Sequence, residues 1–242
     1  MFIRPSTSSD LPSLIQVATS AFQTDDFLTE LCPGRVDNPQ AYKDFWHDHL
    51  TQRINHNSRV VFSAVNSLGD VIGMAVWWYW TLDPSSAPTP HGIPVAPSSL
   101  SAVYPTSEMM ANPILSKEAL AELSIIKEKE TKDFFLGEYK THWHLEWLAV
   151  HPDWWRKGAG TMLLDWGLRQ AEKDGMAAMW EASPEGVEFY QKRGIETIGI
   201  VEFRGVDYPL FVWNGKGKGE TMATAKETAK EIAGEQVEEA EP

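Results

Sequence analysis

Cysteine is nearly absent from this chain, basic residues are in deficit, and long apolar runs are missing. Cys32 is the single cysteine among 242 residues, which excludes an internal disulfide and metal sites of the Cys-x-x-Cys kind. No apolar run approaches the ~20 residues that a membrane-spanning helix needs. Lys and Arg number 21 against 34 Asp and Glu, and the net charge of −13 argues against binding nucleic-acid phosphates. We therefore expect a cytoplasmic protein with no metal, no nucleic-acid partner and no membrane association.

The residues that are abundant indicate one folded domain. Hydrophobic residues make up 43% of the chain and include 11 Trp, unlike the composition of a disordered protein. A domain of this length hides roughly 70–75% of the surface of its unfolded chain, which is enough for a large core. The acidic balance favours a cationic substrate such as an amine, although solubility alone also explains it.

The segment 151–161, HPDWWRKGAGT, is the most informative stretch of the sequence. It follows a strand-like apolar run, 145–150, and precedes a helix-like run, 162–168. The first N–H groups of a helix have no intrahelical partner and lie at the positive end of its dipole. Gly158 and Gly160 remove the side chains that would keep a phosphate away from these groups. The segment therefore predicts a site for a phosphorylated cofactor.

Two common nucleotide motifs are incomplete here. A dinucleotide fingerprint needs a third glycine three residues after the second, where this chain has Leu163. A Walker A loop ends in Gly-Lys-Ser/Thr, and Gly160-Thr161-Met162 lacks the lysine. Neither motif fits the segment well.

The segment instead resembles the phosphate-binding motif of the GNAT acyl-CoA-dependent N-acetyltransferases, Gln/Arg-x-x-Gly-x-Gly/Ala. Gly158 and Gly160 occupy the glycine positions, and Arg156 and Lys157 occupy the basic interior. Trp155 stands where the family has Gln or Arg, which weakens that one contact.

Other segments extend the resemblance over roughly residues 1–80 and 140–213. Residues 2–5 and 10–22 look like the first strand and helix of the family, and 181–195 looks like its second cofactor-side motif. The resemblance implies an α/β protein with the GNAT fold: a central mixed twisted sheet flanked by helices. In this fold, splayed central strands form the acetyl-CoA cleft.

Local patterns predict several elements. Asp10 can cap a helix with an apolar stripe, and a second helix is expected at 39–54. Residues 59–66 and 71–80 read as two strands, and the residues between them are typical of a hairpin turn.

The domain organisation follows from changes in composition. We expect a single GNAT domain over 1–213, with an insertion at 81–140 that holds a Pro- and Ser-rich loop and a helix at 115–135. The insertion is either a lid over the substrate or an exposed excursion with a docked helix. The acidic tail, 214–242, is expected to be a flexible appendage, with partner binding as the alternative.

Chemistry is concentrated in the strand-like run 140–152. Alternation along a strand places two sets of side chains on opposite faces. The first set is His142, His144, Glu146, Leu148 and Val150, and the second is Trp143, Leu145, Trp147 and Ala149. Ionisable groups on an internal strand are costly unless their face meets a cleft or partners.

An amine with a pKa of about 10.4 is protonated at neutral pH and must lose a proton before it attacks a thioester, so the reaction needs a general base. In the GNAT family this strand supplies that base. The resemblance implies Glu146 or His144 as the base, with Glu146 slightly favoured. The alternative is that both are polar residues paired with their neighbours. Tyr190 stands where the family often keeps the proton donor for the CoA thiolate. The alternative is that the Tyr190 side chain only packs in the core.

The resemblance also implies which residues bind the cofactor. Ser183 stands where the family usually has Asn, and its hydroxyl has a shorter reach. A backbone N–H near Leu148 is expected to stabilise the oxyanion. The residues expected to bind acetyl-CoA are Leu148, Ala149, Val150, Arg156, Lys157, Gly158, Ala159, Gly160, Thr161, Ser183 and Tyr190.

An aromatic run, Trp77-Trp78-Tyr79-Trp80, is expected to belong to the core rather than to an acceptor pocket. The implied function is transfer of the acetyl group of acetyl-CoA to a primary amine by direct attack. The acceptor is a small molecule or a protein amine, and the sequence leaves it and the oligomeric state open. The alternatives are a catalytically degenerate acyl-CoA-binding or regulatory module, another acyl group, or a hydroxyl acceptor.

Overall fold

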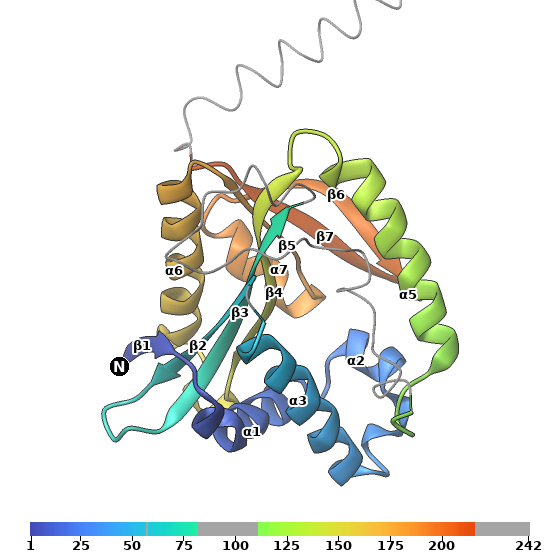
Figure 1. The fold of residues 1–242 in the computed structure, drawn as a ribbon, viewed down its shortest axis with the longest axis vertical. Helices are drawn as coiled ribbons and strands as arrows, with labels where there is room; N and C mark the ends of the chain where they lie inside the picture. The colour runs from blue at the N-terminus through green and yellow to red at the C-terminus, as the bar shows by residue number, and fades with distance from the viewer. Residues whose placement is uncertain (57, 82–110, 216–242) are drawn as a thin grey trace, which may run out of the picture.

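The computed structural model describes residues 1–56, 58–81 and 111–215, and within them one seven-stranded sheet forms the centre of the molecule (Figure 1). The order across the sheet is β1-β2-β3-β4-β5-β7-β6. The strands are β1 (Phe2–Pro5), β2 (Arg59–Val65), β3 (Val71–Thr81), β4 (Thr141–Val150), β5 (Ala177–Glu181), β6 (Glu196–Phe203) and β7 (Val206–Trp213).

Neighbouring strands run antiparallel except β4 and β5, which run parallel. The β4–β5 pairing ends at His144 and Met179, whereas β4 continues to pair with β3 as far as Val150. The two strands therefore separate beyond His144, and one edge of β4 has no neighbouring strand among the described residues. The mixed sheet with splayed fourth and fifth strands is the architecture that the sequence predicts.

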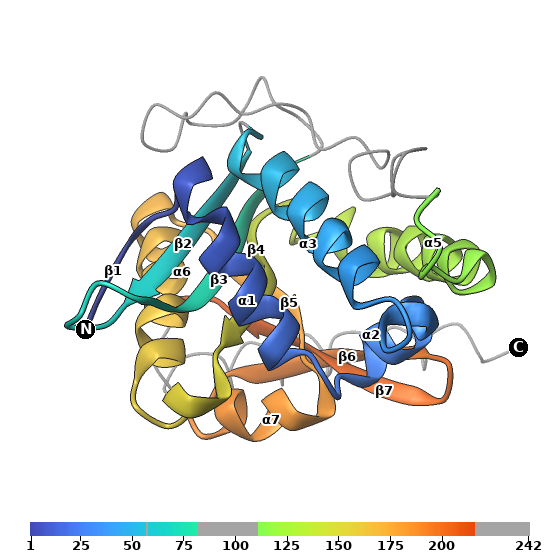
Figure 2. The same ribbon diagram turned by 90° about the horizontal axis from the view of Figure 1, so that it is seen from below.

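Helices cover both faces of the sheet (Figure 2). α1 and α3 pack on one face with Val76 and Ala149 beneath them, and α6 packs on the other over Trp77 and Leu145. The helices are α1 (Leu11–Ala21), α2 (Asp26–Leu31), α3 (Pro39–Ile54), α5 (Lys117–Glu130), which continues into a π-helical turn (Thr131–Phe135), α6 (Ala159–Asp174) and α7 (Pro184–Gln191). Short 3₁₀ turns occupy Ser8–Asp10, Pro33–Arg35 and Pro152–Trp154.

The predicted local elements are confirmed with one correction. The helix at 39–54, the β2–β3 hairpin and the helical character of 115–135 are all present. Asp10, however, does not cap α1 with its side chain, because it already belongs to a 3₁₀ turn and has helical dihedral angles. Its carboxylate turns back to accept the Thr7 N–H at 2.8 Å and to pair with Arg4 at 2.7 Å.

Close contact between α6 and β3 holds one side of the core together. Gly167 of α6 lies directly over Trp77, and a Cβ at this position would come within 2.0 Å of the indole ring. Trp77 Nε1 also donates to the Leu163 carbonyl at 3.3 Å. A small residue is therefore required where the helix crosses the tryptophan, and this contact sets how closely α6 approaches the sheet.

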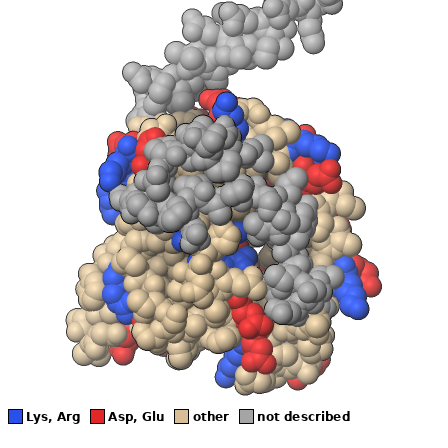
Figure 3. All heavy atoms as spheres, in the orientation of Figure 1, with Lys and Arg blue, Asp and Glu red and all other residues tan. Residues whose placement is uncertain are grey.

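Surface charge and helix hydropathy add two observations. On the face drawn in Figure 3, Lys and Arg lie beside Asp and Glu around the edge of the described part. In the described ranges, no helix combines the length and apolar character needed to cross a bilayer.

The predicted Pro- and Ser-rich loop falls largely in 82–110 and the predicted tail in 216–242, both outside the described residues. The division into a domain, an insertion and a tail stays a prediction.

Candidate active site

A cavity of about 1160 Å³ opens where β4 and β5 separate. Its wall includes β4 from His144 to Val150 and the end of β5 from Trp180. On one side it reaches the loop before α6, and on the other it reaches α3 and α5. Its wall includes residues that pack on both faces of the sheet.

One end of the cavity lies against the start of α6. Gly158 is the residue before the helix and has φ +92°, a conformation that L side chains rarely adopt. A Cβ at Gly158 would meet no atom within 4 Å, so its outer side is open. The helix has no side-chain cap, which leaves the amides of Ala159, Gly160 and Thr161 without a capping side chain. This arrangement is a cradle for an anion.

The basic residues of this loop differ in position. Arg156 lines the cavity, and its φ of +59° places it in the left-handed region that precedes the glycine. Lys157 turns away: its Nζ donates to the Asp153 carbonyl at 2.9 Å and lies 4.7 Å from the Trp154 ring. Lys157 is therefore not in the cavity wall, unlike the other predicted cofactor residues.

Arg193 was missed in the sequence and lies at the same end of the cavity. It follows α7, donates Nη2 to Thr161 Oγ1 at 2.6 Å and stacks over Phe189 at 4.0 Å. The signal that could have found it is its position in the predicted second cofactor motif, three residues after Tyr190. The structure places this guanidinium beside the first turn of α6, where it adds positive charge to the anion cradle.

The two departures from the family motif both lie at the cavity. Trp155 donates its indole N–H to the Val150 carbonyl at 2.7 Å, which ties the loop to the end of β4, and 57% of the residue is exposed. Ser183 immediately precedes α7, and its Oγ would lie 3.6 Å from a Cβ added at Gly186. Both residues line the cavity, so each position faces the space expected for the cofactor.

Tyr190 combines packing with access to the cavity. Its ring packs 4.9 Å from Trp180 and 5.3 Å from Phe211, measured between ring centroids. The residue also lines the cavity. Burial raises the pKa of the phenol well above its ordinary value, so it stays protonated at neutral pH. Tyr190 therefore lines the cavity as a protonated phenol and is part of the core at the same time.

A β-bulge at Glu146 corrects the predicted faces of β4. Val76 pairs with Trp147 and Trp77 pairs with Leu145, so Glu146 is an extra residue in the ladder. The bulge reverses the alternation that follows. Trp147 and Ala149 join the side chains packed under α1 and α3, whereas Leu148 and Val150 pack on the α6 side. The prediction that Leu148 and Val150 share a face with His142 and His144 is therefore wrong.

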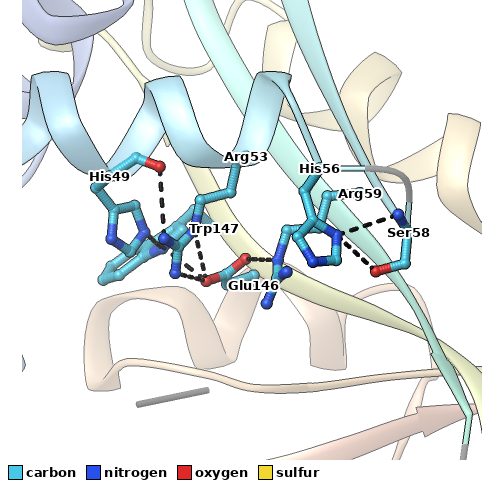
Figure 4. A network of polar contacts seen from close by, with 7 residues as sticks. All are labelled: His49, Arg53, His56, Ser58, Arg59, Glu146 and Trp147. Carbon is cyan, nitrogen blue, oxygen red and sulfur yellow. Dashed lines mark hydrogen bonds and ion pairs between the residues drawn. The ribbon is translucent and has the colours of Figure 1, made fainter. Parts of the chain in front are cut away.

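Glu146 is held by two arginines (Figure 4). Arg53 donates Nη2 at 2.7 Å and Nε at 3.1 Å to one carboxylate oxygen, and Arg59 donates Nε at 3.2 Å to the other. Burial raises the pKa of this carboxyl, but the positive charges of Arg53 and Arg59 outweigh burial and hold it well below its ordinary value. A carboxylate stabilised in this way is a weak base.

The same network ties α3 to β4 through Trp147. Its indole N–H donates to His49 Nε2 at 2.8 Å, so His49 accepts through a neutral nitrogen. Burial, assisted by the charge of Arg53, lowers the pKa of His49 well below its ordinary value. Neither contact has a sequence signal, because Glu146 and Arg53 are 93 residues apart and Trp147 and His49 are 98 residues apart.

His144 is the other candidate base and has a different environment. It is 8% exposed, lines the cavity and lies with Nε2 3.4 Å from Glu181 Oε2. His142 is not in the cavity wall; its Nδ1 lies 2.7 Å from the Tyr139 carbonyl, and burial lowers its pKa to about 3.

The aromatic run of β3 is buried, as predicted, but its two faces differ. Trp77 and Tyr79 belong to the core under α6. Trp78 and Trp80 are 5% and 3% exposed, and both also line the cavity. In the described part of the chain, no group of His, Cys, Asp and Glu could hold a metal ion.

Comparison with known proteins agrees with this geometry. Residues 118–195 match the family model described as Acetyltransferase (GNAT) family. A crystal structure from Corynebacterium glutamicum, described as histone acetyltransferase HPA2 and related acetyltransferase, superposes with a TM-score of 0.52 and 20% identity. That match covers 90% of this chain and 98% of the other. Mosquito arylalkylamine N-acetyltransferase like 5b superposes with a TM-score of 0.53 and 15% identity, covering 87% of this chain and 98% of the other.

A search of curated proteins finds no match. The described chain has the mixed α/β architecture of the GNAT fold. Residues 118–195, about a third of the chain, are also similar in sequence to the GNAT acetyltransferase family.

Proposed function

We propose that this protein transfers the acetyl group of acetyl-CoA to a primary amine by direct attack. The observation that carries the proposal is one cavity that joins the first turn of α6 to His144 through the gap between β4 and β5. This arrangement gives a phosphorylated acyl donor and an amine separate entrances and one meeting point.

The residues at the cofactor end fit acetyl-CoA. Gly158 is open on its outer side, and the following amides together with Arg156 and Arg193 suit a pyrophosphate. The unpaired edge of β4, over Leu148 to Val150, presents backbone groups that can bond the amide-containing arm of the cofactor. When bound, acetyl-CoA supplies the thioester whose acetyl group is transferred.

The acceptor arrives mostly as an ammonium ion and must lose a proton before it attacks. The contacts in the structure favour His144 as the group that takes this proton, because Glu146 is stabilised as a carboxylate by Arg53 and Arg59. The preference for Glu146 drawn from the sequence is therefore not kept. Tyr190 remains protonated and gives its phenolic proton to the departing thiolate. No side chain forms a covalent bond to the acetyl group in this scheme.

Calorimetry with acetyl-CoA, followed by thiol release across a panel of amines, tests the proposal. Gly158→Glu should block the pyrophosphate site and weaken acetyl-CoA binding at least ~10-fold, about 1.4 kcal/mol. Gly69→Glu is the matched control, because Gly69 also has a positive φ and an open Cβ position but lies in the β2–β3 turn. It should bind as the wild type does.

Each outcome of these measurements has a distinct meaning. Binding with amine-dependent thiol release would establish the transferase and identify the class of acceptor. Binding with no release from any amine would favour a regulatory module that keeps the cofactor pocket. If the wild type did not bind acetyl-CoA, the proposed cofactor site would be wrong.

A further inference from the structure

A buried cluster of charged side chains lies beside His144, and the scheme above gives it no role. Glu181 ends β5 with Oε2 3.4 Å from His144 Nε2. Lys127 of α5 donates Nζ to Glu181 at 2.7 Å and to Glu130 at 2.8 Å. The side chains of Glu181 and Glu130 are only 16% and 1% exposed. Buried charges are costly unless they are paired, so this cluster needs an explanation.

The splayed strands place Glu181 next to the imidazole. His144 pairs with Met179 at the last register of the β4–β5 ladder, and Glu181 follows two residues later on the same face of β5. Because β4 moves away at this point, Glu181 has no β4 partner across from it and lies against His144 instead. α5 covers the cluster and brings Lys127 to Glu181 from outside the sheet.

The charge state of the cluster follows from one ammonium group between two carboxyls. Burial and the neighbouring Glu181 raise the pKa of Glu130 well above its ordinary value. Burial opposes the ionisation of Glu181 too, but the charge of Lys127 outweighs it and holds the pKa of Glu181 well below its ordinary value. Glu181 is therefore the carboxylate that faces His144.

A carboxylate beside a neutral imidazole selects one tautomer. A lone pair on Nε2 would be repelled by Glu181, so Nε2 carries the proton and directs it to the carboxylate. His144 Nδ1 is buried and has no hydrogen-bond partner in the described part of the chain. Nδ1 is then the nitrogen whose lone pair is available to take a proton.

We propose that Glu181 is a positioning residue for the general base His144. It accepts the Nε2–H, keeps the Nδ1 lone pair available, and stabilises the imidazolium that forms when the acceptor ammonium gives its proton to Nδ1. The proton then leaves His144 for water before the next turnover. Lys127 holds Glu181 in place, which gives α5, a helix of the predicted insertion, a part in the site. The inference rests on the proposed function, since it takes His144 as the base.

Other groups near His144 cannot imitate this effect. The titratable and charged groups on the elements packed around it are Arg59, which stacks on Trp78 of β3, His142 of β4, Glu181 of β5, and Lys127 and Glu130 of α5. Burial holds the pKa of His142 at about 3, so it stays neutral near physiological pH. Glu181 is the only carboxylate in this group that is charged and within 4 Å of the His144 ring among the described residues.

Nitrogen NMR of the full chain with labelled histidines tests the inference without a substrate. His144→Gln identifies the signal. The wild type should show the Nε2–H tautomer, and Glu181→Gln should reduce the population of this tautomer, because a carboxamide no longer repels a lone pair on Nε2. Glu181→Asp keeps the charge and should keep the Nε2–H tautomer. Glu128→Gln, an exposed glutamate of α5 paired with Lys132, is the matched control and should leave the tautomer unchanged.

An Nδ1–H tautomer in the wild type would overturn the inference even if Glu181→Gln failed to fold. An unchanged His144 tautomer in a folded Glu181→Gln protein would overturn it as well. With an active amine, Glu181→Gln should lower kcat while KM for acetyl-CoA is unchanged, and Glu181→Asp should restore most of kcat. A purely structural role for Glu181 would not change the tautomer of His144.

The failure of the two proposals can be told apart. If His144→Gln kept full activity on a good amine, His144 would not be the base, and the role of Glu181 would fall with it. If no amine supported thiol release, the proposed function would fail, whereas the tautomer seen by NMR would still decide whether Glu181 controls the imidazole. If His144→Gln were inactive and Glu181→Gln kept the wild-type tautomer and kcat, only the role of Glu181 would be rejected.

Discussion

Replacing Glu146 by Gln should destabilise the protein much more than it impairs any proton transfer. In the structure, Glu146 is the shared acceptor of Arg53 and Arg59, whose side chains are 10% and 4% exposed. Removing the carboxylate leaves the buried guanidinium groups of Arg53 and Arg59 close together with no negative charge between them. Breaking a buried ion pair from one side costs about 3–5 kcal/mol. Arg59 also stacks on Trp78 at 4.2 Å, so we expect the lower end, about 3 kcal/mol.

The loss should depend on pH in a direction that the pKa of Glu146 defines. Its pKa in the folded protein lies below its ordinary value, so the carboxylate stabilises the fold fully above the unfolded-state value of about 4.3. This stabilisation disappears as the pH falls through the folded-state pKa. The difference in unfolding free energy between the wild type and Glu146→Gln should therefore be largest near neutral pH and shrink in acid.

Urea denaturation of both proteins, at neutral pH and again in acid, measures this difference. Glu128→Gln is the matched control, since its ion pair with Lys132 is exposed to solvent and such pairs contribute little to stability. Its midpoint should move little at either pH. A Glu146→Gln protein that was as stable as the wild type but inactive would refute this reasoning, because the carboxylate would then act on the substrate.

Two further outcomes follow from the structure. Tyr190→Phe should slow turnover strongly while acetyl-CoA binding measured by calorimetry is unchanged, and full turnover would exclude the proton-donor role. Gly167→Ala should lower the free energy of unfolding, measured by urea denaturation, by about 1–3 kcal/mol, because the added Cβ overlaps Trp77. Gly137→Ala, where no atom lies within 4 Å of the added carbon, should show no comparable loss, and equal losses would contradict the packing argument.

Most residues expected at the cofactor end line one cavity, because the features that place them are local in sequence. Gly158, Ala159 and Gly160 act through the backbone of a strand–loop–helix segment, and Tyr190 lies within a second continuous motif. The exceptions are also local in origin. The Lys157 side chain bonds the Asp153 carbonyl of its own loop, which a count of basic residues cannot show.

The acceptor end could not be predicted in the same way, because a bulge and long-range pairing decide it. A strict period of two places Leu148 with His144, but one extra residue at Glu146 reverses every position that follows. The sequence also gives no sign that Arg53 of α3 and Arg59 of β2 converge on Glu146. The sequence therefore slightly favoured Glu146 over His144 as the base, although Glu146 is paired with two arginines and His144 faces a carboxylate.

The difference between the two ends of the cavity explains why the similarity to a family is easier to recognise than the substrate. The matched residues, 118–195, run from α5 to α7 and include β4, α6 and β5, which line the end of the cavity proposed for the cofactor. Much of the opposite wall comes from α1 to α3, through Phe22, Phe45 and His49, and lies before the matched region. Under the proposed function, these side chains face the space left for the acceptor beside His144. Substitutions at Phe22 or Phe45 should consequently change the preference among amines and leave acetyl-CoA binding unaltered.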